Sequence, residues 1–227
     1  MSDHSFHMPD QKQETRREPE PRWTAVVAAL TVAVLFYAIP QDLKLAPGWL
    51  LLVVVAILLV PTMLFRRLGN DNLNDIFGYA ILSSITLAML TPLIVLIIRL
   101  PSHKDPPVLL LRAAAALWIS NILIFASWYW RLDGGGPNER DKLPFHRDGA
   151  FLFPQMMMDP ELRKQMGEDT WNPGFVDYLF LAFNTSTAFS PTDVPVLSRW
   201  AKGMMIVQSL ISLVTVVLVA ARGVNIL

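Results

Sequence analysis

Residues 183–200, FNTSTAFSPTDVPVLSRW, carry the side chains best suited to contact an ion. Hydroxyls stand at positions 185–187, 190 and 192, and the carboxylate of Asp193 follows directly. Hydroxyl and carboxylate oxygens line the cation pathways of many membrane proteins. The segment separates a short apolar run from a long one, so its polar groups must be accommodated beside or within a membrane.

Other kinds of site chemistry find little support in the composition. The chain has no cysteine, which excludes disulfides and thiolate metal sites. Its four histidines lie outside the apolar segments, which also lack a pair of carboxylates, whereas an intramembrane hydrolase would need such a group. The 19 basic and 19 acidic residues balance, which argues against a nucleic-acid partner. We therefore expect no enzyme activity and no cofactor.

The elements that must position the polar segment are apolar helices. The 227 residues are 53% hydrophobic and only 17% charged, with a mean hydropathy of +0.40. Five segments approach the roughly 20 residues that a helix needs to cross a bilayer, and membrane lipids are the surroundings that such segments require. The five segments are residues 23–39, 49–65, 76–98, 108–130 and 203–221.

The remaining chain divides into a tail, a loop and a short helix. Residues 1–22 are polar and charged in both signs, so we expect a disordered tail before the four helices of residues 23–130. Residues 131–172 form an extramembrane loop, in which the run DPELRKQMG predicts one or two helical turns. The last part, residues 173–227, begins with Pro173 as the first residue of a helix, for which Asn172 is the predicted N-cap.

The helix after Pro173 runs to about Thr185, which is too short to span a bilayer. Because a full apolar span follows, this length is typical of a re-entrant pore-type helix that enters the membrane and returns. Irregular backbone at membrane depth must be buried in protein or line water. We therefore predict an all-α integral membrane protein with five transmembrane helices plus one re-entrant helix before the last span.

This order of elements resembles the pore domain of tetrameric potassium channels, in which a short helix, a filter, an Asp, a Pro and a basic residue precede an inner helix. The family pattern is roughly T-x-T-T-V-G-Y-G-D. The resemblance implies an outer helix at 108–130, an inner helix at 203–221, a homo-oligomer and monovalent cations as partners. Aligned without gaps, the filter-like residues are Thr185, Ser186, Thr187, Ala188, Phe189, Ser190, Pro191, Thr192 and Asp193. The whole chain is also similar to a bacterial family of uncharacterised five-span membrane proteins, the DUF1345-like family.

The filter-like segment departs from the potassium pattern at its two glycines. Glycine permits the backbone geometry that turns successive carbonyls toward an ion, but Ser190 and Thr192 replace both glycines here, and Pro191 fixes its own φ. Two hypotheses follow. The segment forms a degenerate, weakly selective cation pore, or the chain is a non-conducting membrane scaffold in which the polar turn is structural.

Isolated polar residues elsewhere have simpler interpretations. Asn121 and Gln208, within apolar segments, predict hydrogen bonds between helices. Asp177 lies in the first turn of the predicted short helix, where its carboxylate interacts favourably with the dipole of the helix N-terminus. Basic residues around the tail and at Arg66 and Arg67 favour an N-terminus inside, whereas the channel resemblance favours one outside, so the sequence leaves the orientation open. The resemblance to bacterial families indicates the inner membrane.

Overall fold

The computed structural model describes residues 20–99, 106–142, 149–168, 171–187 and 194–223. Within these ranges the chain is helical, and its extended pairing is limited to one bridge between Phe151 and Val196. The helices are α1 (Trp23–Ala38), η1 (Gln41–Leu43), α2 (Gly48–Arg67), α3 (Asp71–Arg99), α4 (Pro107–Leu132), η3 (Asp133–Gly135), α5 (Pro137–Arg140), α6 (Pro154–Met157), α7 (Pro160–Gln165), α8 (Phe175–Thr187) and α9 (Arg199–Gly223). The predicted all-helical class is confirmed.

Four helices, α2, α3, α4 and α9, are long and apolar enough to cross a membrane. They identify the chain as an integral membrane protein. The fifth predicted span, α1, is an apolar helix of 16 residues, equivalent to about 24 Å at 1.5 Å per residue. The predicted turns in DPELRKQMG are present as α7.

Two prolines lie within these helices without ending them. Pro92 is buried in α3 and has no N–H to donate to the carbonyl of Ala88, four residues earlier. The hydroxyl of Thr91 donates to that carbonyl at 3.1 Å. A local side chain therefore replaces the missing backbone hydrogen bond, as membrane helices require.

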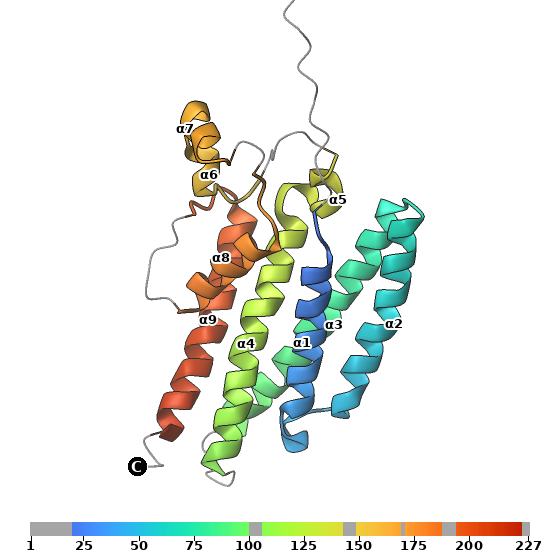
Figure 1. The fold of residues 1–227 in the computed structure, drawn as a ribbon. Coiled ribbons are helices and arrows are strands. Elements are labelled where there is room, and N and C mark those ends of the chain that lie inside the picture. Colours follow the sequence, from blue (N-terminus) through green and yellow to red (C-terminus); the bar gives the residue numbers. More distant parts are fainter. Residues whose placement is uncertain (1–19, 100–105, 143–148, 169–170, 188–193, 224–227) are drawn as a thin grey trace, which may run out of the picture.

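Helix α4 is the central element of the bundle (Figure 1). It packs against α1 and α3 on one side and against α8 and α9 on the other, while α2 packs against α1 and α3. Two buried apolar clusters result. One cluster contains side chains of α1, α2, α3 and α4. The other contains side chains of α4, α8 and α9 together with Phe151 and Phe153 of the loop.

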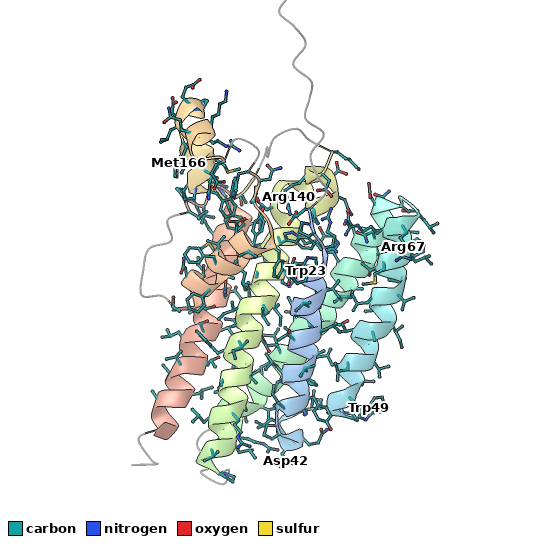
Figure 2. The ribbon with its side chains drawn as sticks, in the orientation of Figure 1. Trp23, Asp42, Trp49, Arg67, Arg140 and Met166 are labelled. Atoms are coloured by element: carbon teal, nitrogen blue, oxygen red, sulfur yellow. The ribbon has the colours of Figure 1, made fainter. Side chains whose placement is uncertain are left out.

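The two ends of the bundle differ. Figure 2 shows Trp23, Arg67 and Arg140 at the end that carries α5, α6 and α7, with Asp42 and Trp49 at the opposite end. At the first end the loop folds onto the helices: the N–H of Leu152 donates to the carbonyl of Pro195 at 3.0 Å, and the N–H of Leu197 donates to the carbonyl of Ala150 at 2.7 Å. This loop thereby fixes the chain just before α9.

Candidate functional site

The short helix α8 begins two residues later than the sequence predicts. Its first residue is Phe175 rather than Pro173, and Asn172 is not its N-cap. The carboxylate of Asp177 instead accepts a hydrogen bond from the N–H of Gly174 at 2.7 Å. Asp177 lies in the first turn of α8, where the partial positive charge of the helix N-terminus stabilises a carboxylate. The predicted position of Asp177 in the helix is thus confirmed.

The C-terminal end of α8 is bound to α9 by side chains. The amide nitrogen of Gln208 donates to the carbonyl of Ala182 and to the hydroxyl of Ser186, both at 2.7 Å. The hydroxyl of Ser209 donates to the carbonyl of Thr185 at 3.3 Å. The last four carbonyls of a helix lack intrahelical donors, and Thr185 is among them in α8, so Ser209 of α9 supplies one of the missing donors.

Helix α4 takes part in the same network. The hydroxyl of Tyr129 donates to the side-chain carbonyl of Gln208 at 2.6 Å, and the amide nitrogen of Asn121 donates to the hydroxyl of Ser212 at 2.8 Å. Asn121 and Gln208 thus form hydrogen bonds between helices, as predicted. We call the six side chains the interhelical polar cluster: Asn121, Tyr129, Ser186, Gln208, Ser209 and Ser212.

The interhelical polar cluster lies well inside the bundle. Gln208 is nine positions after Arg199, the first residue of α9, which corresponds to about 14 Å along the helix axis. Val194 and Pro195, by contrast, lie near the start of α9 beside the loop. The two flanks of residues 188–193 are therefore at different depths: α8 ends at the level of the cluster, whereas Pro195 pairs with the loop near the start of α9.

Three of the predicted filter-like residues lie in the described part of the chain. Thr185 and Ser186 are 6% and 3% exposed. The hydroxyl of Thr185 donates to the carbonyl of Leu181 at 2.8 Å, and that of Thr187 donates to the carbonyl of Asn184 at 3.0 Å. These hydroxyls therefore have partners within a single chain. The other six predicted residues lie outside the described residues: Ala188, Phe189, Ser190, Pro191, Thr192 and Asp193.

A second buried polar group supports the N-terminal end of α8. The carboxylate of Asp133 accepts hydrogen bonds from the hydroxyl of Tyr178, at 2.7 Å, and from the N–H of Ala150. The guanidinium of Arg140 donates to the carbonyls of Trp130 and Asp133, both at 2.7 Å. Asp133 is fully buried, so the end of α4, the loop and α8 share one charged anchor.

Sequence reasoning did not find this anchor, although the run DGGGPNER contains it. Three successive glycines, Gly134 to Gly136, all have positive φ, which turns the chain back so that Arg140 reaches the end of α4. Of the predicted tail of residues 1–22, only residues 20–22 lie in the described part of the chain, and two of them have ion-pair partners there. Glu20 forms an ion pair with Arg140 at 3.0 Å, and Arg22 forms one with Asp141 at 2.5 Å. The sequence of a charged segment does not indicate that its ion-pair partners lie more than 100 positions away.

Metal ligands of the usual kinds do not converge in the described part of the chain, where no group of three His, Cys, Asp or Glu residues could hold an ion. The chain matches no known protein family, curated protein or solved structure. The potassium-channel-like pore therefore stays a prediction from the order of apolar and polar segments in the sequence.

Proposed function

We propose that this protein is a channel-like membrane protein of five transmembrane helices, in which α8 is a re-entrant helix. Residues 185–193 of several copies would surround a weakly selective path for monovalent cations, in the bacterial inner membrane. The carrying observation is the attachment of α8 to α9 through Gln208 and Ser209, about 14 Å from the start of α9. This attachment holds a helix end inside the bundle directly before a polar segment.

The charge at this helix end supports a preference for cations. A helix C-terminus carries partial negative charge, and the last turn of α8 contains no basic residue that would neutralise it. In the family pattern the trailing carboxylate falls on Asp193, which would add a ring of negative charge in an oligomer. Both contributions attract cations and repel anions.

The outer face of α9 supports an arrangement of several copies. In the described chain this helix lies at one edge of the bundle and packs against α4 and α8. An apolar stripe on its other side is half or more exposed, and its members recur at helical spacing. The stripe consists of Ile206, Val207, Leu210, Leu213 and Val217. In a channel-type assembly this stripe would face the neighbouring copies or the axis.

A non-conducting scaffold is the second candidate, and one observation favours it. The hydroxyls of Thr185 and Ser186 take part in hydrogen bonds inside the chain and are buried. Residues that fulfil a structural role in this way need no ion. In that case α8 would serve only to brace α4 against α9.

Cation flux into proteoliposomes distinguishes the two candidates. Purified protein is reconstituted under a potassium or sodium gradient, and flux is followed with a potential-sensitive dye. For a pore we expect flux above that of protein-free vesicles. Thr187→Ala and Asp193→Asn should lower it, because each removes an oxygen ligand or a charge from the proposed path.

Ile57→Leu is the matched control, because Ile57 lies on the exposed face of α2. It should leave flux unchanged. All variants are compared at equal helical content and equal elution volume, so that lost flux cannot be ascribed to misfolding. Flux equal to that of empty vesicles, or flux unaffected by both pore variants, would reject the pore and favour the scaffold.

A further inference from the structure

A pocket of about 470 Å³ opens between α1, α2 and α3, with α4 as its back wall. In Figure 1, α1 and α2 are close at their short connection and diverge toward the end that carries α5. The pocket lies where they diverge. Its deeper walls are apolar and include Val26, Leu59, Met63 and Ile81. In a bilayer, an apolar space between helices loses dispersion contacts unless a hydrocarbon chain fills it.

The mouth of this pocket is cationic. Arg22, Arg66 and Arg131 line it, together with Asn74, and no Asp or Glu is among the lining residues. Arg131 is paired with Asp75 at 3.0 Å and Arg22 with Asp141 at 2.5 Å. Arg66 has no ion pair with any residue that the structure describes, so the mouth retains an uncompensated positive charge.

Arg22 has hydrogen-bond donors that lack acceptors. Its Nη2 contacts Asp141 and Asn138, but its Nε and Nη1 are buried and have no hydrogen-bond partner among the described residues. Burial lowers the pKa of Arg22, against the opposing effect of the Asp141 charge, and the positive charge of Arg66 lowers it further. A buried donor without an acceptor destabilises the folded state, because it has lost its hydrogen bond to water. An anion at the mouth would satisfy these donors and offset the repulsion between the two arginines.

The position of the mouth fits the headgroup layer. Arg22 directly precedes α1, and Arg66 is in the last turn of α2, so both lie where helices leave the hydrocarbon. Trp23, which also lines the pocket, is 66% exposed, as is common for indole rings at the membrane interface. Polar lining at this level and apolar lining below it match the two ends of a lipid.

We propose that this pocket binds an anionic phospholipid, with its phosphate oxygens accepting hydrogen bonds from Arg66 and Arg22 and one acyl chain between α1 and α2. Arginine binds phosphate through its paired N–H groups. The uncompensated charge of Arg66 selects a headgroup that brings no ammonium of its own. This binding site is independent of the proposed pore, which is built from α8 and α9.

Native mass spectrometry of the full chain in uncharged detergent tests the proposal. The protein is titrated with phosphatidylglycerol and with phosphatidylcholine of equal chain length. We expect one tightly bound phosphatidylglycerol, and about fivefold weaker binding after Arg66→Gln, as the loss of one arginine contact implies. Met63→Trp, which narrows the apolar part, should also weaken binding.

Two neighbouring residues supply matched controls on the same helix. Arg67 and Leu64 are exposed but do not line the pocket, so Arg67→Gln and Leu64→Trp should bind phosphatidylglycerol like the parent protein. Glycerol 3-phosphate, which has the anion without acyl chains, should bind far more weakly. Equal affinity for the two phospholipids, binding of glycerol 3-phosphate as tight as that of the lipid, or an equal loss in Arg67→Gln would each overturn the proposal.

Discussion

At the scale of single residues, buried polar side chains determine how the apolar helices are joined. Gln208 is fully buried and contacts both α8 and α4. Asp133, just after α4, is fully buried and contacts α8 and the loop. Apolar helices in lipid gain little from hydrophobic burial against one another, so packing and hydrogen bonds set their arrangement. Two residues therefore govern where α8 lies.

Replacing Gln208 by Leu should destabilise the protein by about 1–3 kcal/mol. The substitution keeps a side chain of similar size but leaves the carbonyl of Ala182 and the hydroxyls of Ser186 and Tyr129 without their partner. The measurement is thermal unfolding in detergent, followed by circular dichroism. Val207→Leu, on the exposed face of the same helix, should change stability little. Equal stability of Gln208→Leu and the parent would mean that these hydrogen bonds do not hold α8.

Residues of this kind could be predicted from sequence only in part. Asn121 and Gln208 are polar residues within long apolar runs, and lipid leaves them no partner except another helix. Glu20 and Arg22 gave no such signal, because their partners Arg140 and Asp141 lie 120 and 119 positions away. A charged residue outside an apolar run can interact with water instead of with another residue. The sequence around it therefore does not show whether it is buried.

At the scale of elements, the apolar runs predicted the helices, whereas the turns between them were harder to predict. The predicted short helix is present as α8, with 13 residues, because its length follows directly from the apolar run. Its first residue was misplaced because the N–H of Gly174 is bound by Asp177 from inside the helix, and Asn172 was not needed as a cap. The glycine-rich run after α4 marks a turn, but its contacts could not be predicted, because they depend on three glycines with positive φ that bring Arg140 back to the end of α4.

That turn provides a prediction with an internal control. Gly136 has φ of 90°, and a Cβ there would lie 2.7 Å from the carbonyl oxygen of Arg131. Gly69 has φ of 69° with nothing within 4 Å of such a Cβ. Gly69→Ala should therefore cost about 1 kcal/mol from its φ alone, and Gly136→Ala at least about 1 kcal/mol more from overlap. Thermal unfolding of the two variants in detergent gives the comparison; equal losses would show that the turn relaxes freely around the added methyl group.

At the scale of the whole molecule, α4 divides the bundle into two parts. One part contains α1, α2 and α3 with the proposed lipid site, and the other contains α8 and α9 with the proposed pore. The membrane class follows from sequence because it depends on length and hydropathy alone. The placement of α4 between the two parts does not, since apolar faces in lipid give no signal of which helix each will contact.

The absence of cysteine allows the assembly to be tested cleanly. Leu213→Cys, on the exposed stripe of α9, should cross-link to a second copy in native membranes if this stripe faces the neighbouring subunits. Ile57→Cys is equally exposed, at 63% against 60%, but lies on α2 in the other part and should remain monomeric. The readout is the ratio of dimer to monomer on a denaturing gel after oxidation. Similar cross-linking at both positions would indicate random collision rather than an interface.

The ion pairs of Glu20 and Arg22 with the turn after α4 have a consequence for how this protein is made. The ribosome must complete four helices before Glu20 and Arg22 meet Arg140 and Asp141, so this end of the bundle closes late in synthesis. Until then the start of α1 lacks the ion pairs that join it to the turn after α4. The same ion pairs require Glu20 and Arg22 to lie on the same side of the membrane as Arg140 and Asp141 of the long loop.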